Sequence, residues 1–128
     1  MLRYVLITNA ASCIGFGALF AAAPGFVVAH IAGGDGGGPP QFLLIALGLG
    51  LIANGAHLIW TAAQAAPARS TILYFVMGDA GWVAATGVLL VAGLWITTTT
   101  GVVWSLAVAG FVAACGVAQW RLAPPAAS

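Results

Sequence analysis

Four long, mostly apolar segments constrain the fold of this chain more than any other feature. A helix that crosses the ~30 Å hydrocarbon core of a bilayer needs roughly 20 apolar residues, and each of the four is that long. They cover residues 2–23, 41–65, 71–96 and 101–122. Residues 25–31 are too few to span a membrane, so we expect them to extend the first helix or to form an interfacial turn.

The scarcity of charged residues leads to the same conclusion. Of the 128 residues, 62% are hydrophobic and 4% are charged, whereas a soluble domain carries about a quarter charged residues because its surface faces water. Lipid must therefore be the solvent for most of the chain. We predict an all-α membrane protein, a four-transmembrane-helix bundle with up-down-up-down topology, that forms a single domain over residues 1–128. Its helices should cross at angles near about +20°, as in most membrane bundles.

The three arginines predict how the bundle is oriented in the membrane. Arg3, Arg69 and Arg121 fall at the N-terminus, in the second loop and near the C-terminus. In a four-pass chain these places share one side, and positively charged residues favour the cytoplasmic side. We therefore expect a multi-pass protein of the cell inner membrane with both termini in the cytoplasm. The alternative is that residues 1–23 are a cleaved secretory signal, although Asn9 and other polar residues interrupt its apolar run.

Charge and residue spacing also limit the possible partners. A net charge of +1 provides no basic patch for nucleic acid. Cys13 and Cys115 lack the CxxC spacing of metal sites, and His30 and His57 fall at different depths, so they cannot jointly ligate one haem iron. We expect no metal and no cofactor. Besides the lipid bilayer, the expected partners are further copies of the chain or a larger membrane complex, because so small a bundle encloses little volume.

Polar residues recur on one side of each predicted helix, mostly at steps of three and four, and such spacing places them on one face. They are Thr8, Asn9 and Ser12 in the first segment, Asn54, His57, Thr61 and Gln64 in the second, Asp79, Trp82 and Thr86 in the third, and Ser105, Cys115 and Gln119 in the fourth. These faces are expected to turn toward one another and away from lipid.

Depth in the membrane selects a candidate site from these faces. Four residues lie at one level, roughly 10–12 Å from the cytoplasmic helix ends at 1.5 Å per residue: Asn9, His57, Asp79 and Cys115. If the second and third helices form a tight hairpin that turns near Ala68, His57 and Asp79 face each other. We therefore predict a contact between His57 and Asp79, direct or through one water, completed by Asn9 or Asn54.

An aspartate inside a membrane costs a few kcal/mol even on the most lenient insertion scale, so it is a candidate functional residue. The candidate ligand or proton site comprises His57, Asp79, Asn54, Asn9 and Trp82. The alternative interpretation is that these side chains only lock the helices in register.

Three classes of function remain for such a chain. We favour a non-catalytic membrane component, meaning a small subunit, an assembly factor or an oligomeric scaffold. The second class is a small transport protein, or a ligand- or proton-binding protein, that uses His57 and Asp79. The third class, an enzyme, needs several positioned acids, bases or metal ligands. Because the chain has two carboxylate residues and two histidines in all, we expect no catalytic residues.

Overall fold

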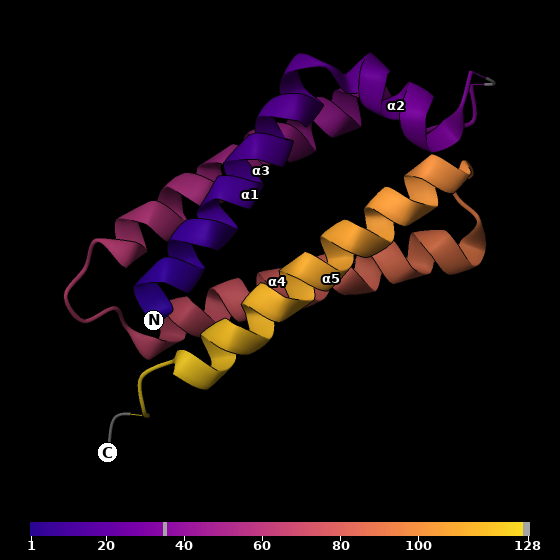
Figure 1. Cartoon of the computed structure of the whole chain (residues 1–128). Helices are drawn as coiled ribbons and strands as arrows, with labels where there is room; N and C mark the ends of the chain where they lie inside the picture. The colour runs from indigo at the N-terminus through magenta and orange to yellow at the C-terminus, as the bar shows by residue number, and fades with distance from the viewer. Residues whose placement is uncertain (35, 127–128) are drawn as a thin grey trace.

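The computed structural model describes residues 1–34 and 36–126, which form five helices and no strand. The helices are α1 (Leu2–Ala22), α2 (Pro24–Ala32), α3 (Gln41–Ala62), α4 (Arg69–Ala92) and α5 (Thr99–Leu122). All except α2 are long and apolar enough to cross a membrane. Successive long helices run in alternate directions (Figure 1). The predicted all-α fold with four spanning helices is confirmed.

A break in the backbone separates α1 from α2. The break falls at Ala23, which leaves the helical conformation with φ −136° and ψ 54°. Pro24 then opens α2, because the first position of a helix needs no N–H group. The stretch predicted over residues 25–31 is thus a separate helix of nine residues. Its C-terminal end is joined to the segment before α5, since the Ile31 carbonyl accepts a hydrogen bond from the Thr97 amide at 2.8 Å.

A glycine and a threonine set the ends of α4 and α5. Gly93 adopts the left-handed conformation, with φ 64°, directly after Ala92, and a residue in this conformation commonly ends a helix. For this reason α4 stops four residues before its predicted end. Thr98 caps α5, because its Oγ1 accepts a hydrogen bond from the Gly101 amide at 2.9 Å. The helix therefore begins at Thr99, within the stretch predicted to be a loop.

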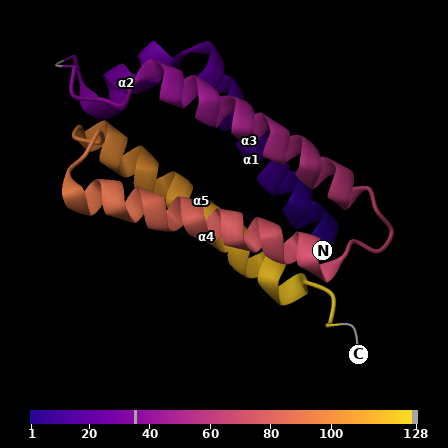
Figure 2. The ribbon, with the colours of Figure 1, turned by 180° about the vertical axis from the view of Figure 1, so that it is seen from behind.

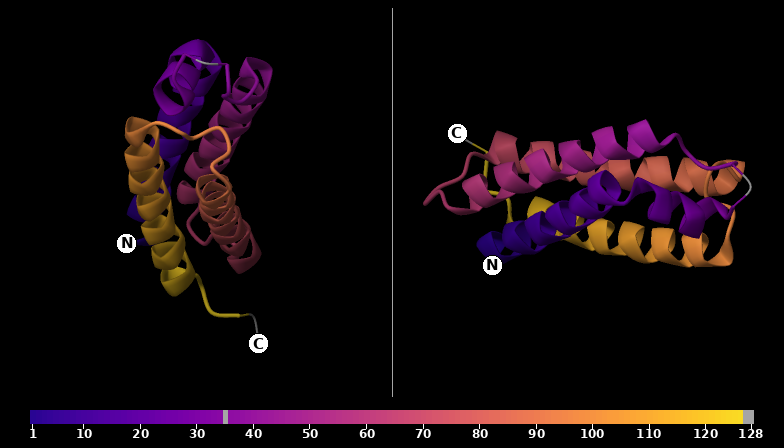
Figure 3. Two further views of the ribbon diagram at one scale, coloured as in Figure 1. Left: turned by 90° about the vertical axis from the view of Figure 1, so that its right-hand side faces the viewer. Right: turned by 90° about the horizontal axis from the view of Figure 1, so that it is seen from above.

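The long helices pack as two pairs. α1 lies along α3 and α4 lies along α5, and the two pairs run side by side (Figures 1 and 2). α1 also packs against α5, which joins the pairs. By contrast, α3 and α4 are consecutive in the chain but are not among the closely packed neighbours. Figure 3 shows that the result is an elongated bundle, with α2 at the end opposite the N-terminus.

Glycines allow α1 and α3 to approach each other closely. A Cβ atom added at Gly48 would lie 2.5 Å from the Gly17 carbonyl oxygen and 2.7 Å from the Ala21 nitrogen. One added at Gly17 would lie 2.6 Å from the Gly48 oxygen. Because these neighbours are backbone atoms, they cannot move aside as a flexible side chain would. Small residues at such crossings are typical of membrane bundles, which depend on close packing.

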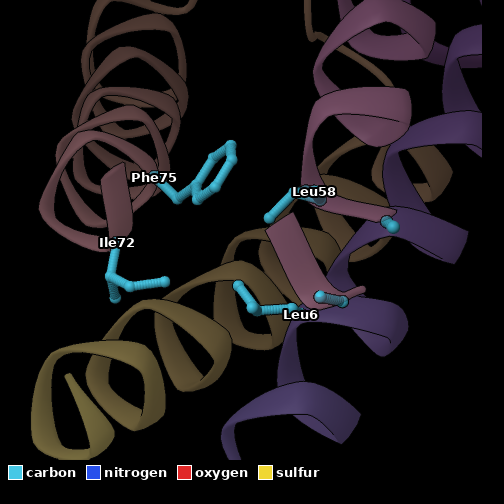
Figure 4. Close-up of a cluster of buried hydrophobic side chains, with 6 residues drawn as sticks. Leu6, Leu58, Ile72 and Phe75 are labelled. Atoms are coloured by element: carbon cyan, nitrogen blue, oxygen red, sulfur yellow. The ribbon is translucent and has the colours of Figure 1, made fainter. Parts of the chain in front are cut away.

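Apolar side chains from three helices meet at the end of the bundle that holds the N-terminus. Leu6 of α1, Leu58 of α3, and Ile72 and Phe75 of α4 form the centre of this buried cluster (Figure 4). The cluster holds α4 against the α1–α3 pair here, even though the backbones of α3 and α4 are not closely packed.

The three arginines lie at this same end of the molecule. Arg3 is in the first turn of α1 and Arg121 in the last turn of α5, and the N-terminus and the C-terminal end of α5 both lie there (Figure 1). Arg69 opens α4, and its Nη1 donates a hydrogen bond to the Pro124 carbonyl oxygen at 2.6 Å. The arrangement that underlies the predicted orientation, with all three positive charges on one side, is therefore present.

Candidate functional site

Asp79, near the middle of α4, is the centre of a buried polar network. Asn9 Nδ2 donates hydrogen bonds to Asp79 Oδ1 at 3.2 Å and Oδ2 at 3.0 Å. Gln119 Nε2 donates to Asp79 Oδ2 at 2.7 Å. The exposed fractions are 1% for Asn9, 7% for Asp79 and 0% for Gln119. We call these three residues the Asp79 network. It joins α4 to α1 and α5, and thereby joins the two helix pairs.

Local features of α5 position the Gln119 side chain. A Cβ atom added at Gly116 would lie 3.2 Å from the Asp79 Cβ, so glycine at this position lets α5 approach the carboxylate. Gln119 Nε2 also donates to the Cys115 carbonyl oxygen at 3.1 Å. The side chain thus points back along its helix, as long helical side chains do. Gln119 Oε1 is buried and has no hydrogen-bond partner among the described residues.

The network agrees with the sequence-based prediction in part. The predicted proximity of Asn9 to Asp79 is present, because Asn9 donates two hydrogen bonds to the carboxylate, whereas its role in a ligand or proton site stays a prediction. The sequence places Gln119 on a polar face but outside the predicted site, which was selected by depth, and in the structure Gln119 lies only three residues before the end of α5. The Gln119 backbone therefore lies closer than Asp79 to the end of the bundle that holds the N-terminus. Its side chain points back along α5 and so reaches the level of the Asp79 carboxylate. The spacing of Cys115 and Gln119 on one face was the available signal.

The structure does not pair His57 with Asp79, and the direct contact predicted between them is wrong. The His57 ring instead packs among aromatic rings. Its centroid lies 4.9 Å from that of Phe75, 5.8 Å from Tyr74 and 5.9 Å from Trp60. The hydrogen bonds that reach the Asp79 carboxylate in the described part of the chain come from the amides of Asn9 and Gln119.

The position of the turn between α3 and α4 explains this error. The prediction placed the turn near residue 68, but α3 already ends at Ala62 and α4 begins at Arg69. His57 therefore lies five residues from the end of its helix, whereas Asp79 lies ten residues from the start of α4. The difference of five residues corresponds to about 7.5 Å along the helix axis. At the level of His57, α4 presents Tyr74 instead.

A cavity of about 370 Å³ lies between the four long helices, and Asp79 is on its wall. Asn9, Asn54 and Trp82 also line it, so it brings together all the predicted site residues except His57. Cys13 links two of them, because Asn54 Nδ2 donates to its Sγ at 3.6 Å and this Sγ donates to Asn9 Oδ1 at 3.8 Å. Polar groups of α3 are thereby connected to the Asp79 network.

The lining of the cavity includes side chains that are exposed at the outer surface of the bundle. Two of its lining residues on α4, Tyr74 and Met77, are 60% and 71% exposed. A second cavity of about 580 Å³ lies toward α2 and shares Phe16, Trp82 and Val108 with the first. Its other lining residues are mostly apolar or aromatic. The polar wall at Asp79 is thus bordered by a larger apolar space.

The chemistry available at this site is limited. In the described part of the chain, no group of three or more His, Cys, Asp or Glu residues is arranged to hold a metal ion. The donors to the carboxylate are uncharged amides. Comparisons with protein-family models, with curated proteins and with solved structures find no match to this chain. The residues and geometry of the chain itself therefore carry the functional interpretation.

Proposed function

We propose that this chain is a non-catalytic component of the cell inner membrane that acts as a small subunit, an assembly factor or an oligomeric scaffold. The observation that carries this proposal is the Asp79 network. Its one carboxylate accepts hydrogen bonds from two other helices. Polar groups in hydrocarbon must find partners, and interhelical hydrogen bonds together with close packing hold membrane bundles together. The Asp79 network therefore supports a role in fixing the arrangement of the bundle.

A structural role makes a specific prediction for substitutions of Asp79. Asp79→Asn keeps one acceptor oxygen and should leave assembly nearly intact, whereas Asp79→Ala removes both acceptors. The experiment compares the two variants with the natural chain by crosslinking in native membranes and by measuring mass in several mild detergents. We expect an oligomer or a larger complex that survives Asp79→Asn. A monomeric mass in every detergent, with no crosslinked partner, would contradict the proposal.

The orientation of the bundle is part of the same proposal. Arg3, Arg69 and Arg121 lie at one end of the molecule, and positively charged residues favour the cytoplasm. Both termini should therefore lie in the cytoplasm. A fluorescent protein fused after Ser128 should fold and fluoresce, while alkaline phosphatase at the same place should stay inactive. The opposite pair of results would reverse the proposed orientation.

A second candidate function is a ligand- or proton-binding membrane protein, and the cavity beside Asp79 favours it. Ligand sites are concave and mostly apolar, hold a few positioned polar groups, and usually measure about 300–1,000 Å³. The cavity beside Asp79, at about 370 Å³, falls in this range. If binding at Asp79 is the function, Asp79→Asn should abolish activity although the protein still folds. This result separates the second candidate from the first.

A further inference from the structure

We propose that the cavity beside Asp79 binds an organic cation, specifically a quaternary or protonated amine that carries an apolar group. This inference rests on the second candidate function and names its ligand class. Four observations carry it: a carboxylate without a cationic partner among the described residues, spare acceptor capacity on that carboxylate, an aromatic and apolar lining around it, and access from the lipid-facing surface.

The first observation is the missing positive charge at Asp79. A charged group buried in a low-dielectric interior is costly unless it is paired with an opposite charge. The amides of Asn9 and Gln119 donate hydrogen bonds to the carboxylate but carry no charge. Arg69 bonds Pro124 at the end of the bundle, and the His57 ring packs among aromatic rings. A cation in the cavity would supply the charge that the described residues do not.

The second observation is that the carboxylate retains capacity to accept. Two carboxylate oxygens offer about four lone-pair positions. Oδ2 accepts from both Asn9 and Gln119, whereas Oδ1 accepts only the longer bond from Asn9, at 3.2 Å. Asp79 also forms part of the cavity wall. A cation in this space can therefore approach Oδ1 without displacing Gln119.

The third observation is the aromatic and apolar lining. Phe16, Tyr74 and Trp82 line the same cavity as Asp79. Aromatic faces attract cations, tryptophan most strongly, and such surfaces are typical of sites that recognise quaternary ammonium groups. A bare metal ion would use little of a space of about 370 Å³. The apolar cavity of about 580 Å³ beside it provides space for an apolar substituent.

Access to the site also suits such a ligand. Tyr74 and Met77 are exposed where the cavity meets the surface of the bundle, and in a spanning helix this surface faces lipid. An amphiphilic cation that has entered the membrane can therefore reach Asp79 from the side. A strongly hydrated inorganic ion has no comparable route through hydrocarbon.

The test uses benzyltrimethylammonium and its uncharged isostere neopentylbenzene, which have the same shape. The complete chain in nanodiscs of zwitterionic lipid is dialysed to equilibrium against radiolabelled benzyltrimethylammonium, and binding to empty nanodiscs is subtracted. We expect saturable binding that an equal free concentration of neopentylbenzene does not displace. Asp79→Asn should weaken this binding by at least about tenfold, because the attraction between opposite charges is lost. Gly50→Ala, at an open position outside the cavity, should bind as the natural chain does.

Several results would overturn the inference. If the isostere displaces the cation equally well, the cavity binds apolar ligands, so the second candidate function stands and the ligand class is wrong. If benzyltrimethylammonium does not bind saturably, the ligand class is wrong, whereas proton binding at Asp79, the other form of the second candidate function, is unaffected by this result. Should Asp79→Asn fail to fold, Trp82→Leu serves as the second variant. It should weaken cation binding by about threefold or more, because the aromatic face is removed, and unchanged affinity would contradict the proposed site.

Discussion

Replacing Asp79 should destabilise the bundle by an amount that depends on how many hydrogen-bond acceptors the new side chain keeps. Asp79→Ala leaves two buried amides, of Asn9 and Gln119, without their acceptor. Interhelical hydrogen bonds in membranes average about 0.6 kcal/mol and reach about 1.7, and bonds to a charged group are roughly twice as strong as neutral ones. At the average value, two donors to a charged group then correspond to a loss of about 2.5 kcal/mol.

Asp79→Asn should cost less, because asparagine keeps one acceptor oxygen in nearly the same place. One of the two donors, Asn9 or Gln119, retains its partner, so the expected loss is about 1 kcal/mol. The cost of placing a carboxylate in hydrocarbon does not offset these losses. In the unfolded state the separated helices stay in the membrane and carry the same carboxylate, so this cost is present in both states. The order of stability should therefore be aspartate, asparagine, alanine.

The assay is reversible unfolding in mixed micelles, in which the mole fraction of dodecyl sulfate is raised and helix content is followed by circular dichroism. Free energies of unfolding are compared at a common detergent composition. Thr86→Ala is the matched control, because Thr86 lies on α4 two turns beyond Asp79 and outside the Asp79 network. If Asp79→Ala and Asp79→Asn are equally stable, or if either exceeds the natural chain, the network does not hold the helix pairs together.

Three further substitutions test other parts of the structure. His57→Phe should change stability by less than about 1 kcal/mol, because phenylalanine keeps the packing against Phe75; a larger loss in the same unfolding assay would indicate a polar partner for His57. Gly48→Val should cost about 1–3 kcal/mol or prevent folding, because its Cβ meets backbone atoms at 2.5 Å, whereas Gly50→Val, in open space, should be nearly neutral. Thr98→Ala should cost about 1 kcal/mol by removing the cap of α5, and hydrogen exchange should then rise in the first turn of that helix.

The sequence predicts the spanning helices well because their signal is local. The apolar length of each segment, the break before Pro24 and the start of α4 at Arg69 depend only on neighbouring residues. The four segments and their alternating directions could therefore be predicted from the sequence alone. The predicted end of α4 was wrong by four residues, because a single glycine, Gly93, stops the helix.

The candidate site depended on helix packing, which the sequence does not display. The level of Asp79 was predicted correctly relative to Asn9, since both lie on helices that begin at the same end. The direct contact predicted between His57 and Asp79 is wrong because the prediction assumed that α3 and α4 form a tight hairpin that turns near residue 68. α3 packs along α1 instead, through Gly17 and Gly48. Glycine content alone could not distinguish those two from the many glycines that face open space.

The most direct test of the Asp79 network is a distance measured in the membrane. The chain contains two aspartates and two asparagines, so ¹³Cγ-aspartate and side-chain ¹⁵N-asparagine can be introduced by residue type for solid-state NMR. An Asn54→Gln variant assigns the signal to Asn9. Because Asn9 Nδ2 lies 3.0 and 3.2 Å from the two carboxylate oxygens, the distance from Asn9 Nδ2 to Asp79 Cγ should be below about 4 Å. Absence of this dipolar coupling would contradict the network.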